Sequence, residues 1–233
     1  MTRETSVGTC NSMTAGVEAD GYGEGRCLPA SPRVMDSDAP RAWDGRLAAL
    51  ISTVGSPPVL ASTVLLVTAL TLSSPRAWMW VGIYLLLGVL TPLLYLVWLV
   101  KRGDVTDIDV QLRKQRAQPL LVTIACTAVG WLGLVLGGAP ATLTFVAGGV
   151  WLQLVVIFIV TLRWKISVHA ATAAASTTVA WALLGTPVPM LLVVPLVAWS
   201  RVRLRRHTVL QAAAGALLGF LVFLTITTLI PSQ

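Results

Sequence analysis

The only two histidines of this 233-residue chain lie in polar segments that adjoin long apolar runs. His207 belongs to SRVRLRRHTVLQ, residues 200–211, and His169 belongs to RWKISVHA, residues 163–170. Arginine binds phosphate through paired, charge-assisted hydrogen bonds, and histidine serves as nucleophile or general acid in phosphoryl transfer. Two histidines among arginines and lysines therefore indicate a phosphate site.

A third polar segment, KRGDVTDIDVQLRKQRAQP at residues 101–119, also adjoins an apolar run. Its Arg113 and Arg116 share one face if the segment is helical, and Lys114 lies between them. Phosphoryl transfer requires that the charge on the equatorial oxygens be neutralised, by a metal or by several cations. Arginines and lysines are plentiful enough in the three polar segments to supply such cations.

The composition is that of an integral membrane protein. Hydrophobic residues make up 55% of the chain and charged residues only 12%, with a mean hydropathy of +0.78, whereas soluble domains carry about 25% charged residues. In such a protein a net charge of +7 reflects basic cytoplasmic loops and contact with anionic lipids, which argues against a nucleic-acid partner. The three cysteines are scattered, with neither metal-site nor disulfide spacing.

The hydrophobic pattern predicts an all-α polytopic transmembrane bundle of about six to seven spans. Residues 1–39 are rich in Gly, Ser, Thr and Asp and predict a disordered tail. Residues 40–56 predict a short amphipathic helix at the membrane interface, and residues 57–233 the transmembrane domain. The apolar segments lie at about 57–73, 77–100, 119–137, 141–162, 168–185, 187–206 and 208–230.

Basic residues crowd the loops after the second, fourth and sixth apolar segments, while the opposite loops hold almost none. The positive-inside rule places the basic loops, and with them the N-terminus, in the cytoplasm. We therefore expect all three polar segments, and the site they form, at the cytoplasmic face of a bacterial-type plasma membrane.

These segments resemble the three motifs of the type 2 phosphatidic acid phosphatase superfamily, which are Lys-x6-Arg-Pro, Pro-Ser-Gly-His and Ser-Arg-x5-His-x3-Asp. The third motif is matched by Ser200, Arg201 and His207, with Gln211 in place of the aspartate. In the second, ISVH retains the serine and histidine but lacks the proline and glycine.

The first motif of that family is the one that this chain matches least well. Aligned on Pro119, the chain has Gln111 and Gln118 where the family has lysine and arginine. Arg113, Lys114 and Arg116 lie close enough to substitute for them. The order of the motifs and their placement on one side agree with the family, and the resemblance covers residues 100–220.

The resemblance implies a metal-free phosphatase acting on a lipid phosphate or an isoprenoid phosphate or diphosphate, with membrane lipids around it. His207 would be the nucleophile that forms a phosphohistidine, and His169 the general acid for the leaving group. Gln211 would replace the acid that orients His207, because residues four apart share a helical face. The phosphate would be held by Arg201, Arg113, Arg116, Lys114, Lys165, Ser167 and Ser200.

Asp104, Asp107 and Asp109 give a second interpretation. Such carboxylates can hold Mg²⁺ against a diphosphate, as the Asp-rich loops of UbiA-type prenyltransferases do. The chain would then be a prenyl-diphosphate transferase or cyclase. The same aspartates can instead form salt bridges with Arg113, Lys114 and Arg116. A third alternative, favoured by Gln211 and the divergent first segment, is a non-catalytic lipid-phosphate-binding protein.

Overall fold

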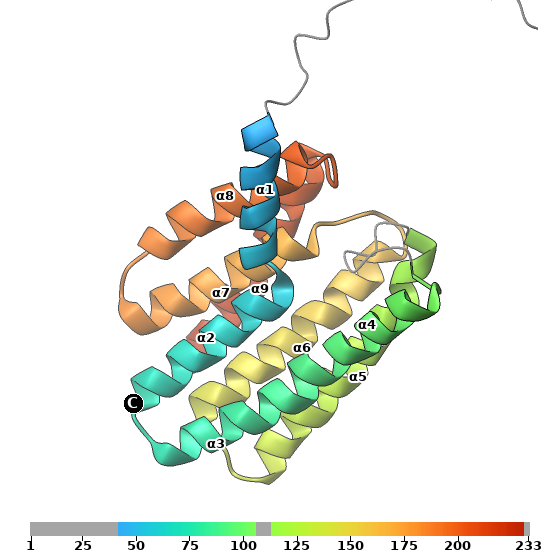
Figure 1. The fold of residues 1–233 in the computed structure, drawn as a ribbon. Coiled ribbons are helices and arrows are strands. Elements are labelled where there is room, and N and C mark those ends of the chain that lie inside the picture. The colour runs from blue at the N-terminus through green and yellow to red at the C-terminus, as the bar shows by residue number, and fades with distance from the viewer. Residues whose placement is uncertain (1–41, 106–112, 231–233) are drawn as a thin grey trace, which may run out of the picture. The chain divides into compact units, whose positions relative to one another are not determined.

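The computed structural model describes residues 42–105 and 113–230, and every regular element within them is helical (Figure 1). This confirms the predicted all-α class, while the expected tail, residues 1–39, lies outside the described residues. The helices are α1 Ala42–Val54, α2 Pro57–Leu72, α3 Pro75–Tyr84, a π-helical segment Leu85–Leu90, α4 Thr91–Arg102, α5 Arg113–Leu136, α6 Ala141–Thr161, α7 Val168–Leu184, α8 Val188–Arg203 and α9 Val209–Leu229.

Four stretches are long and apolar enough to cross a membrane, which indicates an integral membrane protein. They are Pro75–Arg102, Ala117–Leu136, Ala141–Thr161 and Val209–Leu229, and α1 with α2 would make a fifth, bent by 49°. Helices α2, α7 and α8 have 16, 17 and 16 residues, so each is only about 24–26 Å long against a hydrocarbon core of about 30 Å. Length and composition thus support four or five spans and not the expected six to seven.

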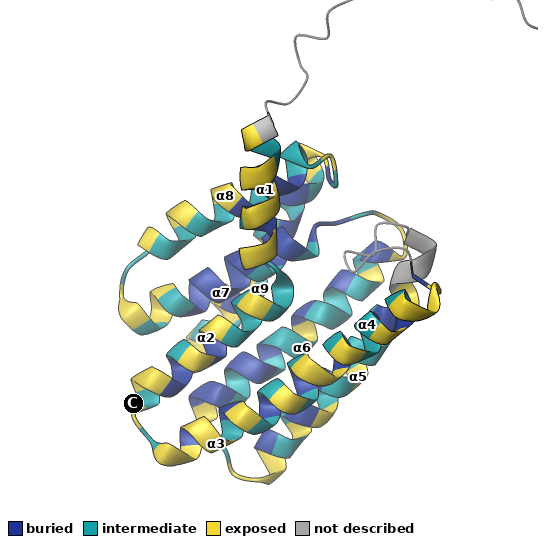
Figure 2. Ribbon diagram, in the orientation of Figure 1, coloured by how far each residue is buried: buried dark blue, intermediate teal, exposed yellow. Residues whose placement is uncertain are grey.

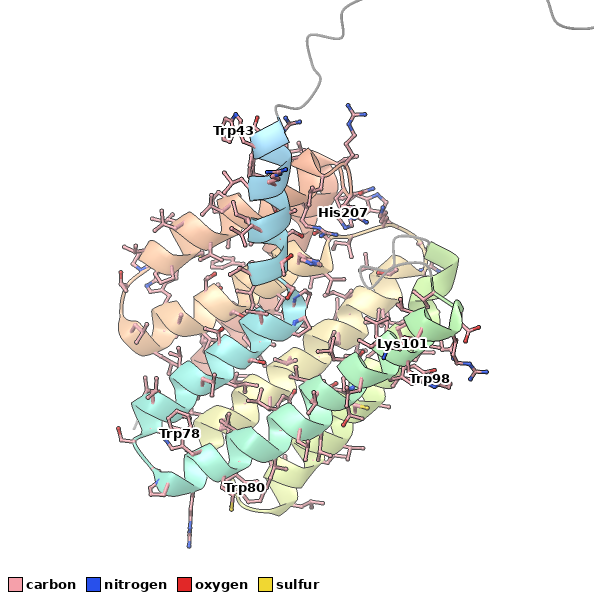
Figure 3. The ribbon with its side chains drawn as sticks, viewed as in Figure 1. Trp43, Trp78, Trp80, Trp98, Lys101 and His207 are labelled. Atoms are coloured by element: carbon pink, nitrogen blue, oxygen red, sulfur yellow. The ribbon has the colours of Figure 1, made fainter. Side chains whose placement is uncertain are left out.

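Tryptophans mark the two ends of the membrane helices. Trp98 and Trp199 lie near the C-terminal ends of α4 and α8, and Trp78 lies in the first turn of α3; all three are exposed. Figure 3 shows Trp98 toward the end of the bundle where His207 lies, and Trp78 toward the opposite end. Exposed tryptophans at both levels are typical of the aromatic belts at membrane–water interfaces.

Helix α7 is the most enclosed part of the bundle (Figure 2). It packs against α9, α8 and α2, and ten of its 17 residues are buried. Two glycines of α9 allow the closest approach: a Cβ on Gly215 would lie 2.5 Å from the Ser167 carbonyl oxygen, and one on Gly219 would overlap the Ala171 carbonyl. This small-residue packing holds the N-terminal halves of α7 and α9 together.

Candidate functional site

A cavity of about 400 Å³ lies among the helices, and each helix from α2 to α9 contributes at least one residue to its lining. Its walls are mostly apolar, and its volume falls within the range of small-molecule sites. Arg201, His169 and His207 line it together, although they come from α8, α7 and the turn before α9. The structure therefore brings both histidines and one predicted arginine to one cavity.

His169 is the second residue of α7, and only 8% of it is exposed. Ser167 is the N-cap of that helix, and its hydroxyl accepts a hydrogen bond from the Ala170 amide at 3.4 Å. Free amide groups and the helix dipole make such an end favourable for an anion. The start of α7 thus presents both an imidazole and partial positive charge.

A tight turn after α8 carries the chain from Arg201 to His207. The Arg201 carbonyl oxygen accepts hydrogen bonds from the amides of Arg206 at 3.0 Å and His207 at 3.3 Å. Arg205 adopts the left-handed conformation, φ 53°, that this form of helix ending requires. Because the turn folds back on the last turn of α8, His207 reaches the same cavity as Arg201.

Arg201 is 2% exposed, and α1 supplies a partner for it. Its Nη1 donates a hydrogen bond to the Ser52 hydroxyl at 2.7 Å. Arg203, two residues after Arg201, forms an ion pair with Asp44 of α1, with 3.4 Å between Nη2 and Oδ2. Sequence reasoning missed Ser52, although Asp44 and Ser52 are eight residues apart and so share a face of α1.

Gln211 closes a capping box at the start of α9. The Thr208 hydroxyl accepts a hydrogen bond from the backbone amide of Gln211, and the side-chain Oε1 of Gln211 accepts one from the backbone amide of Thr208, both at 3.3 Å. The pattern Thr-x-x-Gln is a sequence signature of this motif, and the sequence reasoning overlooked it. Local helix capping therefore gives this glutamine a role beside any it has toward His207.

The capping box also constrains the tautomer of His207. Its Nδ1 lies 3.2 Å from Gln211 Oε1, the oxygen that accepts the Thr208 amide. An acceptor oxygen at this place requires Nδ1 to carry the proton, because two acceptors cannot form a hydrogen bond. In the neutral ring, Nε2 then keeps its lone pair, as a nucleophile needs.

The other predicted phosphate-binding residues are placed differently. Lys165 is half-buried, and neither it nor Ser167 nor Ser200 is among the residues that line the cavity. The Ser200 hydroxyl donates to the Val197 carbonyl at 2.7 Å. Arg113, Lys114 and Arg116 belong to the first turn of α5, and their side chains lie outside the described part of the structure.

Of the three aspartates predicted to hold Mg²⁺ in the second interpretation, the structure describes only Asp104. Asp104 is exposed and lies 3.8 Å from Arg102, which also stacks on Trp98. Asp107 and Asp109 lie outside the described residues. Within residues 42–105 and 113–230, no three His, Cys, Asp or Glu side chains gather as a metal site would need.

Taken together, the cavity can hold an amphiphile. Arg201 offers a buried cation for a phosphate, His207 an imidazole nitrogen with a lone pair, and the apolar walls suit a hydrocarbon tail. His169 adds a second group able to transfer a proton. In comparisons with known proteins, no family model, no curated protein and no solved structure matches this chain.

Proposed function

We propose that the protein is a membrane-embedded phosphatase for a lipid phosphate or an isoprenoid phosphate or diphosphate. The observation that carries this proposal is that His169, Arg201 and His207 line one largely apolar cavity. A buried arginine that lines the same cavity as two histidines suits a phosphate, and the apolar walls suit the tail of a lipid.

The proposed reaction has two steps and uses no metal. In the first, His207 Nε2 attacks phosphorus, the bond from phosphorus to the lipid oxygen breaks, and protonated His169 gives its proton to that oxygen. In the second, neutral His169 takes a proton from water as the water oxygen attacks phosphorus. The bond between phosphorus and His207 Nε2 breaks, its electron pair returns to Nε2, and phosphate leaves. Arg201 offsets the negative charge in both steps.

Phosphate release by the purified protein is the test. We expect release from phosphatidic acid or geranylgeranyl phosphate in the presence of EDTA, and loss of release in His207→Ala. Arg205→Gln is the matched control, because Arg205 is exposed and does not line the cavity. Metal-dependent release that survives His207→Ala would reject the mechanism.

Two other outcomes would identify the alternatives. Lipid-phosphate binding without turnover would indicate a non-catalytic binding protein, for which the uncharged Gln211 beside His207 is the supporting observation. Formation of a new carbon skeleton from a prenyl diphosphate, dependent on Mg²⁺ and on the aspartates, would indicate a transferase or cyclase.

We further propose that the site faces the cytoplasm of a bacterial-type plasma membrane, with α7 and α8 as additional short crossings. The basic loops support this orientation. In a variant without the native cysteines, Arg163→Cys should react with a membrane-impermeant maleimide in inside-out vesicles and not in intact spheroplasts. Labelling in spheroplasts would reverse the orientation.

A further inference from the structure

Gln153 is an unusual lining residue of the cavity. It lies within α6, is only 4% exposed, and its Oε1 has no hydrogen-bond partner among the described residues. Two hydroxyl groups that line the same cavity are satisfied by backbone: Thr127 donates to the Thr123 carbonyl at 2.8 Å and Ser176 to the Leu60 carbonyl at 3.2 Å. Polar side chains inside membrane helices that face a cavity typically mark the path of a ligand.

The position of Gln153 along α6 sets its depth. Thr161, the last residue of α6, also lines the cavity, and residues 162–167 join it to the start of α7, where His169 lies. Eight residues separate Thr161 from Gln153, which is about 12 Å along a helix axis. A ligand with its phosphate at the histidines would therefore place the middle of its tail near Gln153.

We propose that Gln153 accepts a hydrogen bond from a donor, a hydroxyl or an N–H, midway along the apolar part of the ligand. This inference rests on the proposed function, because it takes the cavity to be the substrate site, and it narrows the lipid class. The preferred ligand is a phosphate amphiphile with a polar donor in its tail. A plain hydrocarbon tail would leave the buried carbonyl unpaired, which weakens binding.

Two lysophosphatidic acids that differ by one hydroxyl group test this directly. The ricinoleoyl form carries a hydroxyl near the middle of its chain, and the oleoyl form does not. Affinities would be measured for the full-length protein in detergent by isothermal titration calorimetry. We expect the wild-type protein to bind the ricinoleoyl form about tenfold more tightly, the size expected for one added hydrogen bond to a buried group.

The decisive result is a change of opposite sign in Gln153→Leu. This variant should bind the ricinoleoyl form more weakly than the wild-type protein and the oleoyl form more tightly, because no carbonyl remains to be left unpaired. Gln118→Leu is the matched control: Gln118 is exposed, donates to the Tyr95 hydroxyl at 2.7 Å, and does not line the cavity. It should leave both affinities unchanged.

Other results would overturn the inference. Equal affinities in the wild-type protein, or a change of the same sign for both lipids in Gln153→Leu, would mean that Gln153 serves packing or holds a water molecule. If Gln153→Leu fails to fold, Gln153→Met, which keeps the side-chain length, should give the same reversal. The absence of binding by either lipid would reject the lipid site as well.

Phosphate release from the same two lipids separates this inference from the proposed function. Preference for the ricinoleoyl form without phosphate release would support the role of Gln153 and reject the phosphatase. Release that depends on His207, but is equal for the two lipids at low concentration, would support the phosphatase and reject the role of Gln153.

Discussion

The starts of α7 and α9 use the same residue types in different order. Each begins at a hydroxyl N-cap, Ser167 or Thr208, and each has a neighbouring histidine that is 8% exposed and lines the cavity. His169 follows its cap and lies inside the first helical turn, whereas His207 precedes its cap, where its ring meets Gln211 Oε1. The two histidines therefore lie on opposite sides of their N-caps along the chain.

That difference supports a division of roles. His169, the proposed proton donor, lies in the first turn of α7, where free backbone amides favour a phosphate anion. At the start of α9, the Gln211 oxygen lies 3.2 Å from Nδ1 of His207, so the proposed attack uses Nε2. The N-terminal ends of α7 and α9 are also joined directly, because the backbone amide of Ser167 donates a hydrogen bond to the backbone carbonyl of Gln211 at 3.3 Å.

The largest effect on stability and on phosphate release should come from pushing apart the N-terminal ends of α7 and α9. Gly215→Ala would place a Cβ 2.5 Å from the Ser167 carbonyl oxygen, and backbone cannot yield as a side chain can. We expect a loss of about 1–3 kcal/mol in unfolding free energy and a loss of phosphate release, measured by thermal unfolding in detergent and by phosphate assay. Gly133→Ala is the control, since a Cβ there meets nothing within 4 Å. Equal tolerance of both changes would refute the close contact.

A smaller effect should follow from removing the hydrogen bond between Ser52 of α1 and Arg201 of α8. Ser52→Ala removes the hydroxyl that accepts from Arg201 Nη1. Because hydrogen bonds to charged groups contribute about 1.5–3 kcal/mol, we expect KM for a lipid phosphate to rise at least tenfold, with a smaller change in kcat. Ser52→Thr should restore KM. Thr53→Ala, an exposed neighbour on the same helix, should leave it unchanged.

Gln211 can be tested for its two roles separately. Gln211→Leu removes half of the capping box, with an expected cost of about 1 kcal/mol in unfolding free energy, and it slows phosphate release. Gln211→Glu keeps the capping box and adds a carboxylate beside His207, so release should become faster at equal stability. Unchanged release in both variants would mean that Gln211 serves capping alone.

The smallest effect concerns the turn that delivers His207. Arg205 has a φ of 53°, a conformation that costs a residue with a Cβ more than it costs glycine. Arg205→Gly should raise the unfolding free energy by up to about 1 kcal/mol and leave phosphate release unchanged. Arg163→Gly, at an exposed arginine outside the left-handed region, should give no gain. A loss of stability in Arg205→Gly would contradict this account of the turn.

The sequence by itself determined the helical class and the approximate bounds of the apolar helices, because both depend on local periodicity. A shared helical face was the expected reason for the relation of His207 to Gln211, and this reason was wrong. His207 precedes the N-cap Thr208, and the capping box brings Gln211 Oε1 to its ring. The capping box is local too, and the Thr-x-x-Gln pattern that encodes it is present in the chain. Span number was predicted less well, because hydropathy does not determine helix length: α2, α7 and α8 are apolar but have only 16, 17 and 16 residues.

Only the tertiary structure decided which faces meet. Arg201 and Ser52 are 149 residues apart, and nothing in the spacing of either segment pairs them. The same holds for the Gln153 amide oxygen, which has no hydrogen-bond partner among the described residues, and for the cavity that His169, Arg201 and His207 share. The physical reason is that sequence periodicity determines which side chains share one face of a helix. What such a face packs against depends on contacts between helices, such as the close approach of α7 and α9 at Gly215 and Gly219.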